Sequence, residues 1–322
     1  MHVILAAASN APHNTLTYLQ AIVIGVLQGV TELFPISSLG HGVILPQLLG
    51  WTGIVSSESA SESNFLSFLV GLHVGTAIAL IVFYFSDWKR IISGMATTVK
   101  DRSMANTNGR LGWLLVVGSV PVGLVGLVLE KKLRVLFADP KWASIFLIVN
   151  GLILGLGELV RRRSLRAHGI SLTKAAHARG AAHTASAADS EAKGWKHLQD
   201  LPVLDALLIG ASQILALLAG ISRSGVSMVT GLVRGLDHED AARFTFLLAT
   251  PIILAAGLYK LPSLFGHNGD GIRGQVLVGS IAAGFAAYAS VRFLVRYFET
   301  KTLWPFAIYC LVVGTACTIH FA

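Results

Sequence analysis

Six stretches of this sequence are apolar over lengths that suit a crossing of the lipid bilayer. A transmembrane helix needs about 20 mostly apolar residues, and the candidates are 65–85, 111–129, 142–160, 244–259, 274–291 and 302–322. Only 13% of the residues are charged and 53% are hydrophobic, whereas a soluble domain carries roughly 25% charged residues. This pattern excludes a disordered chain, a coiled coil and an ordinary soluble enzyme. It predicts an all-α polytopic membrane protein.

Two further apolar regions, 16–49 and 201–232, are too long for one crossing and are interrupted near the middle. Glu32 and Pro35 interrupt the first region, and Gly220 and Arg223 interrupt the second. Backbone that leaves the helix at membrane depth is tolerated only where it is buried in protein or lines a wet cavity. We therefore expect each region to be a re-entrant helix–loop–helix that enters the membrane and turns back.

The two interrupted regions are similar to each other in sequence. With a constant offset of 185 residues, eight of twenty aligned positions are identical: Ala21/Ala206, Ile24/Ile209, Gly25/Gly210, Gln28/Gln213, Leu33/Leu218, Ile36/Ile221, Ser37/Ser222 and Gly40/Gly225. This similarity indicates an internal repeat. Three full crossings separate the copies, so the second copy enters from the opposite face. Such an inverted-topology repeat brings broken segments together near the midplane.

The distribution of Lys and Arg predicts the orientation of the chain. If the chain starts outside, the segments 86–110 and 161–200 lie inside with most of the basic residues, as the positive-inside rule requires. Both termini are then outside. We expect a single integral membrane domain with a first repeat at about 16–160, a flexible cytoplasmic loop at 161–200 and a second repeat at about 201–322. Such loops account for the net charge of +8, and we expect no nucleic-acid partner.

Three ionisable residues, Glu32, His41 and Arg223, lie within or beside the two interruptions. Ionisable groups inside a membrane are costly and are usually functional. An Arg fork, Ser hydroxyls and amides at a helix N-terminus make a site for an anion such as phosphate. His41 adds a group that exchanges protons near neutral pH. Glu32 has two roles open to it, which are orienting His41 and holding a divalent cation that bridges phosphates.

The remaining candidates are hydroxyl, glycine and amide residues of the same two loops. We expect Ser38 to be catalytic, as a candidate nucleophile, and five residues to bind substrate: Ser37, Ser222, Ser224, Gly225 and Gln28, the last of which precedes the first loop. His73 and His320 lie in apolar spans, and we expect them to be core or cavity residues. Asp205 opens an apolar segment and is expected to be a first-turn helix acid.

The two loops carry motifs that resemble the bacterial undecaprenyl-diphosphate phosphatase family, also named for bacitracin resistance. The first motif runs from Gln28-Gly29-Val30-Thr31-Glu32 through Pro35-Ile36-Ser37-Ser38-Leu39-Gly40-His41, and the second is Ala219-Gly220-Ile221-Ser222-Arg223-Ser224-Gly225. Leu72-His73-Val74-Gly75-Thr76 and Pro305-Phe306-Ala307-Ile308-Tyr309 are further similarities. The resemblance extends from about residue 17 to the end. The chain resembles a divergent member of this family, with Gln28 and Leu69 where acids are common and Leu39 where a hydroxyl residue is usual.

The resemblance implies a fold of six crossings and two re-entrant helix pairs in an inverted repeat. It implies hydrolysis of undecaprenyl diphosphate to the monophosphate and inorganic phosphate, which recycles the lipid carrier for cell-wall glycan export and confers bacitracin resistance. It also implies a divalent cation, Mg²⁺ or Ca²⁺, and a site at the outer face of the bacterial cytoplasmic membrane. Family roles carry over to Glu32, Ser38, His41, Ser222 and Arg223.

Several alternatives stay open at this point. The nucleophile is Ser38, His41 or water, and Glu32 is the candidate metal ligand. A transporter of prenyl phosphate is a rival to the enzyme, because inverted repeats with broken helices are the usual architecture of secondary transporters. A paralogue acting on another prenyl diphosphate is a second rival. The expected partners are a prenyl diphosphate substrate and membrane lipids, and a homodimer is left open.

Overall fold

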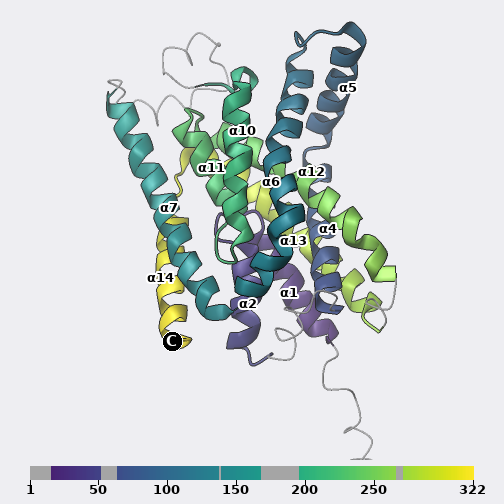
Figure 1. Cartoon of the computed structure of the whole chain (residues 1–322), viewed down its shortest axis with the longest axis vertical. Coiled ribbons are helices and arrows are strands. Elements are labelled where there is room, and N and C mark those ends of the chain that lie inside the picture. The colour runs from purple at the N-terminus through teal and green to yellow at the C-terminus, as the bar shows by residue number, and fades with distance from the viewer. Residues whose placement is uncertain (1–15, 52–63, 138, 168–195, 266–270) are drawn as a thin grey trace, which may run out of the picture.

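A computed structural model describes residues 16–51, 64–137, 139–167, 196–265 and 271–322, and these residues form helices and no strand. The structure is a bundle of helices with its C-terminus at the end opposite to the end of α7 (Figure 1). In chain order the helices are α1 (Tyr18–Thr31), α2 (Ser38–Leu48), α4 (Asn64–Phe83), α5 (Phe85–Asp101), α6 (Thr107–Phe137), α7 (Pro140–Ala167), η2 (Leu198–Asp200), α10 (Val203–Ser212), η3 (Gln213–Leu217), α11 (Arg223–Val233), α12 (His238–Phe265), α13 (Arg273–Thr300) and α14 (Trp304–His320).

Four of these helices are long and apolar enough to cross a membrane, within α6, α7, α12 and α13. A fifth span is present if α4 and α5, which bend by 81° at their junction, are counted together. Helix α14, with 17 residues, is among the shorter apolar helices. The prediction of an all-α polytopic membrane protein is therefore confirmed, and the exact number of six crossings stays a prediction.

The two interrupted regions each fold as short helices on either side of a break. Helix α1 ends at Thr31 and α2 begins at Ser38, while α10 and η3 end before α11 begins at Arg223. The hydroxyl of Ser37 accepts a hydrogen bond from Gly40 N, and that of Ser222 accepts one from Gly225 N, both at 3.2 Å. These N-caps are paired by the 185-residue offset. The sequence repeat is thus also a repeat of local structure, since the same serine starts the second helix in each copy.

Each copy packs its first helix against a span from the other half of the chain. Helix α1 lies against α13, and α10 lies against α6. The repeat-related residues Gly25 and Gly210 lie at these contacts, where an added Cβ would overlap the carbonyl oxygens of Gly279 and Gly118. Glycine is therefore required at both positions, because only a residue without Cβ lets two helix backbones approach this closely.

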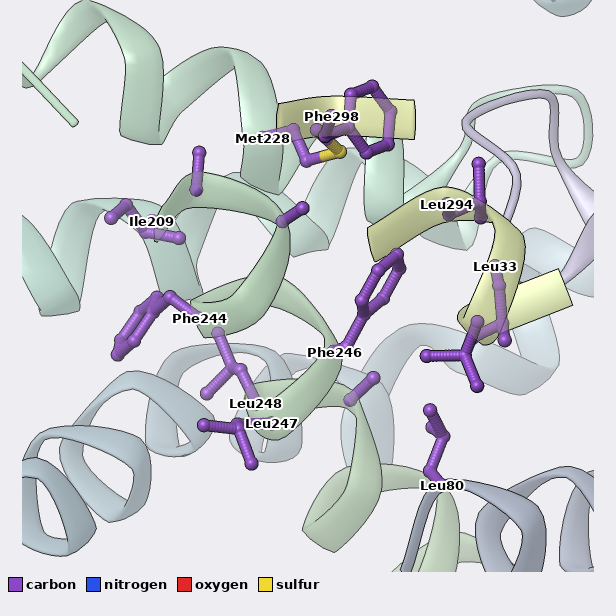
Figure 2. Close-up of a cluster of buried hydrophobic side chains, with 14 of the residues drawn as sticks. Leu33, Leu80, Ile209, Met228, Phe244, Phe246, Leu247, Leu248, Leu294 and Phe298 are labelled. Carbon is purple, nitrogen blue, oxygen red and sulfur yellow. The ribbon is translucent and has the colours of Figure 1, made fainter. Parts of the chain in front are cut away.

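Helix α12 supplies the centre of the hydrophobic core (Figure 2). Phe244, Phe246, Leu247 and Leu248 are fully buried there. Around them lie buried residues of the other elements: Leu33, Leu80, Ile209, Met228, Leu294 and Phe298. Leu33 belongs to the break after α1 and Ile209 to α10. The core thereby fixes both interrupted regions against a common support, because packed interiors tolerate little displacement.

Segments with an expected cytoplasmic location are joined to one another by polar contacts. Arg110 donates to Leu201 O at 3.1 Å, which ties the start of α6 to the start of α10. Arg243 of α12 pairs with Asp87 of α5 at 2.5 Å. These contacts join α6 to the segment before α10 and α5 to α12. The distribution of basic residues predicts that these helix ends lie on one side of the membrane, and the contacts are consistent with that prediction.

Asp205 occupies the first turn of α10, as expected, and it is almost fully buried. Its carboxylate pairs with Lys196 at 2.5 Å and with Arg234 at 2.6 Å. Two cations thus offset the cost of burying this charge. This ion triad joins residues before α10 and after α11 and was not anticipated from the sequence.

Two expectations about loops need correction. The segment 86–110 is mostly helical, because α5 covers residues up to Asp101 and α6 begins at Thr107. The segment 161–200 begins as helix, since α7 continues to Ala167, and it ends with η2. Helix α5 is amphipathic and not apolar, which is why a search for apolar runs missed it. The predicted flexible linker otherwise lies outside the described residues.

Candidate active site

The two breaks meet through Glu32 and Arg223. Glu32 Oε1 lies 2.5 Å from the guanidinium Nη2 of Arg223, and the two side chains are 6% and 18% exposed. The hydroxyl of Ser38, the first residue of α2, donates a hydrogen bond to Glu32 Oε2. A carboxylate, a guanidinium and a hydroxyl from the two copies therefore form one buried cluster. This places three of the predicted residues together.

Gln28 and His73 complete the surroundings of Glu32. Gln28 Nε2 donates to Glu32 Oε2 at 2.8 Å and lies 3.3 Å from His73 Nε2. His73 Nδ1 is 2.8 Å from Leu69 O, so it carries the proton and leaves Nε2 as an acceptor. His73 was expected to be a core or cavity residue, and it lies beside the candidate catalytic carboxylate. His73 belongs to α4 and not to either motif loop, so the loop motifs did not indicate that it lies beside Glu32.

Ser37 joins the two loops by its side chain. Its Oγ accepts from Gly40 N and from Gly220 N, both at 3.2 Å. The backbone of Ser37 has a φ of 73° and that of Gly220 a φ of 109°. A positive φ strains a residue with a side chain, and the two hydrogen bonds to Ser37 offset that strain. Gly220 also needs to be glycine because a Cβ there would overlap Ala143 O.

Asn150 of α7 bridges the two loops, and the sequence analysis missed it. Its Nδ2 donates to Pro35 O at 2.9 Å, and its Oδ1 accepts from Ser222 N at 3.0 Å. The side chain is fully buried. Burying a lone side-chain amide in an apolar span is costly unless the amide is hydrogen-bonded. The presence of Asn150 in such a span was therefore a signal in the sequence that it has buried polar partners. We assign it the role of a clamp between the loops.

Ser222 and Ser224 contribute a further connection. Their hydroxyls lie 3.0 Å apart, and Ser224 Oγ donates to Phe34 O at 3.2 Å. Because Ser224 donates to that carbonyl, Ser222 is the donor between the two serines. Gly225 N is engaged by Ser222 Oγ. These residues lie in the site as expected and hold the loops together, while their contact with a substrate stays a prediction.

His41 lies in the site with partners that differ from those expected. Its Nδ1 is 2.7 Å from Ser37 O and its Nε2 is 2.9 Å from the hydroxyl of Tyr309. The carbonyl only accepts, so Nδ1 carries the proton and neutral Nε2 accepts from Tyr309. The two rings also stack, with centroids 5.7 Å apart. Ser37 and Tyr309 orient this imidazole, and the Glu32 carboxylate is engaged by Arg223.

The described residues around Glu32 do not suit a protein-held divalent cation. Mg²⁺ and Ca²⁺ require several oxygen acceptors, whereas Arg223, Gln28 and Ser38 all donate to Glu32. In the described part of the chain, no group of three His, Cys, Asp or Glu residues has the spacing of a metal site. His73 is a neighbour of these types, with its Nε2 3.6 Å from Glu32 Oε2, and Arg223 occupies the place of a counter-cation; that Glu32 is a metal ligand stays a prediction.

The arrangement has the chemical parts for transfer of a phosphoryl group. The Ser38 hydroxyl, the candidate nucleophile, donates to Glu32, so a proton acceptor is already beside it. Arg223 supplies a positive charge for phosphate oxygens. Helices α2 and α11 both begin at this cluster, and free backbone N–H groups at helix starts favour anions.

Comparison with known proteins covers nearly the whole chain. The profile of the family described as bacitracin resistance protein BacA matches residues 21–316. Undecaprenyl-diphosphatase 2 of Frankia alni is 53% identical over 95% of this chain and 98% of its own length. Undecaprenyl-diphosphatase of Mycolicibacterium paratuberculosis is 52% identical over 95% and 98%. Undecaprenyl-diphosphatase 2 of Chromobacterium violaceum is 42% identical over 92% and 96%.

Proposed function

The chain belongs to the bacitracin resistance protein BacA family, and on this premise we propose that it hydrolyses undecaprenyl diphosphate to undecaprenyl phosphate and inorganic phosphate. The observation that carries the proposal is the contact of Ser38 and Arg223 with one carboxylate, Glu32. This activity regenerates the lipid carrier for cell-wall glycan export and confers resistance to bacitracin. The protein is accordingly a multi-pass membrane hydrolase.

Arg223 binds the diphosphate in the proposed reaction. Its guanidinium is paired with Glu32 in the structure, and a phosphate with more negative charge competes for that pairing. When Arg223 turns to the phosphate, the Glu32 carboxylate is free to accept a proton. Arg223 then stabilises the charge on the transferring phosphoryl group, which is where most catalysis of this class originates.

Ser38 is the proposed nucleophile because its hydroxyl already donates to Glu32. Its Oγ forms a bond to the terminal phosphorus as the bond from that phosphorus to the bridging oxygen breaks. Glu32 takes the serine proton, and undecaprenyl phosphate leaves with the electron pair of the broken bond. Water then cleaves the phosphoserine and releases inorganic phosphate.

His41 and the remaining serines are proposed to shape the phosphate site. The imidazole supports the strained backbone of Ser37 through Nδ1. Its Nε2 accepts from Tyr309; if Nε2 instead takes up a proton from water and Tyr309 turns away, the imidazolium donates that proton to a phosphate oxygen. Ser222 caps α11, and Arg223 and Ser224 are the first residues of this helix, so the two serines flank Arg223 at the phosphate site.

The proposed location is the bacterial cytoplasmic membrane, with the catalytic site reached from outside. Six crossings and two re-entrant segments in an inverted repeat fit the repeat-related N-caps of Ser37 and Ser222. Contacts such as Arg110 with Leu201 support a cytoplasmic end rich in basic residues. The division into a first repeat, a cytoplasmic loop and a second repeat is part of the proposal, and α7 takes the first residues assigned to the loop, up to Ala167.

The test of this function is phosphate release by the purified protein in detergent. Undecaprenyl diphosphate is supplied, and inorganic phosphate is measured against time. We expect release by the wild type and loss of release in Arg223→Ala. Movement of undecaprenyl phosphate across liposomes without any phosphate release from the diphosphate would instead identify a transporter.

A further inference from the structure

A narrow slot opens beside the candidate nucleophile, between α1, α2 and α4. Ser38 and Gln28 lie at the end of the slot that adjoins Glu32, because both donate to that carboxylate. His73 lines the slot beside Gln28, and the rest of the lining is aliphatic or glycine, with Leu27, Leu39 and Leu69 among it. No Asp, Glu, Lys or Arg lines it. The candidate reaction centre therefore adjoins a small cavity with an aliphatic side.

We propose that this slot holds the first isoprene unit of the lipid substrate, an inference that rests on the proposed function. Four bonds separate the terminal phosphorus of a prenyl diphosphate from the first carbon of its tail. If Ser38 attacks that phosphorus, the tail begins a short distance beyond the hydroxyl. The leucines of the slot are the apolar surface next to Ser38 that can receive it.

The outer surface next to the slot suits the remainder of the tail. Helix α1 carries exposed apolar side chains on one face, with Leu19 at 69%, Ile22 at 40% and Val26 at 44% exposure. These positions are spaced by three and four residues and so share a face of the helix. Leu27, the neighbour of Val26, lines the slot. A long tail leaving the slot therefore meets an apolar helix face that suits bilayer lipid.

Gly42 provides the means to test the slot. It lines the slot from α2, and a Cβ added there has no atom within 4 Å. A side chain at this position therefore enters open space and does not displace the backbone. Gly123 of α6 offers the same freedom, with no atom within 4 Å of an added Cβ, and it does not line the slot. Gly42→Leu and Gly123→Leu are thus a matched pair.

The experiment compares three diphosphate esters: methyl, dimethylallyl and undecaprenyl. For the wild type and Gly123→Leu, we expect kcat/KM to rise from the methyl to the dimethylallyl ester, because the slot binds one isoprene unit. In Gly42→Leu we expect the ratio of kcat/KM for the dimethylallyl ester to kcat/KM for the methyl ester to fall about tenfold, because one buried aliphatic group is excluded. KM for the undecaprenyl ester should rise. An unchanged ratio in Gly42→Leu, or an equal loss for all three esters, would overturn the proposal.

A binding measurement separates this inference from the proposed activity. A prenyl diphosphate with a photoreactive diazirine on its first isoprene unit is irradiated with the protein, and the modified peptides are identified by mass spectrometry. We expect modification at Leu39 or Leu69, and less of it in Gly42→Leu. Modification elsewhere overturns the slot whether or not the wild type releases phosphate. Absence of phosphate release with modification of these leucines would overturn the activity alone.

Discussion

Glu32 and Arg223 lie 2.5 Å apart although 191 residues separate them in the chain. Each comes from the break in one copy of the repeat, and the surroundings exclude most solvent from both. Removing either charge leaves the other buried without a partner, which strongly destabilises the folded protein. The ion pair therefore links the stability of the two breaks to the catalytic group that we propose.

The first prediction concerns this pair. Arg223→Met alone should lower the midpoint of thermal unfolding, because it leaves Glu32 buried without its partner at a cost of about 3–5 kcal/mol. The double variant Glu32→Gln/Arg223→Met should regain most of that stability while staying inactive. Differential scanning calorimetry in detergent measures the unfolding midpoint, and phosphate release measures the activity. A double variant as unstable as Arg223→Met would contradict the pairing as the source of the loss.

The second prediction concerns Ser38. With undecaprenyl diphosphate labelled in the terminal phosphate, the wild type should form a phosphoserine at residue 38 that mass spectrometry locates. Ser38→Ala should form none and should release phosphate only at background rate. Ser212→Ala is the control, since that hydroxyl bonds only within its own helix segment. Normal turnover by Ser38→Ala would mean that water or His41 attacks the phosphorus.

The sequence was sufficient to predict both breaks and that Glu32, Ser38 and Arg223 lie together, while the catalytic roles of these residues and of His41 stay predictions. This is because the cost of charges and helix breaks inside a membrane is visible in a single sequence. The internal similarity then indicated that the two loops lie together. The hydrogen bonds between the loops confirm that they do.

The partners of these residues were less accessible to sequence reasoning. Asn150 and Tyr309 are single polar residues in apolar spans, and their roles depend on how α7 and α14 pack against the loops. His73 was assigned to the core because nothing local distinguishes a buried histidine from one beside a carboxylate. The helical nature of 86–101 was missed for a different reason, since amphipathic α5 carries many polar residues.

The third prediction concerns Asn150 as a positioning residue. Asn150→Ala leaves Pro35 O and Ser222 N without partners, at a cost of about 1–3 kcal/mol each. We expect a lower unfolding midpoint and a fall in kcat that exceeds the change in KM, because the two loops lose their common clamp. Ser144→Ala on the same helix is the control, since that buried hydroxyl bonds within α7.

A conservative variant distinguishes positioning from mere support of the fold. Asn150→Asp keeps an acceptor for Ser222 N but has no donor for Pro35 O. If it restores the unfolding midpoint but not kcat, the donor to Pro35 is the part that positions the loop. If kcat follows the midpoint in both variants, Asn150 acts only on stability.

The fourth prediction concerns Tyr309. Tyr309→Phe keeps the ring that stacks on His41 and removes the hydroxyl that donates to Nε2. Stability should change by no more than about 1 kcal/mol, the usual net value of one hydrogen bond. We expect the dependence of kcat on pH to change shape, because the imidazole loses one of its two fixed partners. A pH profile identical to that of the wild type would show that His41 does not need this contact.

The fifth prediction concerns metal binding by the substrate-free protein. Glu32 is the one acidic residue in the cluster with Gln28, Ser38 and Arg223, and each of these three donates a hydrogen bond to it. A cation placed at Glu32 would face a guanidinium and an amide N–H group, and both oppose it electrostatically. We therefore expect Mn²⁺, used as a paramagnetic probe for Mg²⁺, to show no stoichiometric binding by electron paramagnetic resonance. Arg223→Gln removes the opposing charge and is the variant in which weak binding should emerge. Stoichiometric Mn²⁺ binding to the wild type that disappears in Glu32→Gln would show that the carboxylate leaves Arg223 for a metal before substrate arrives.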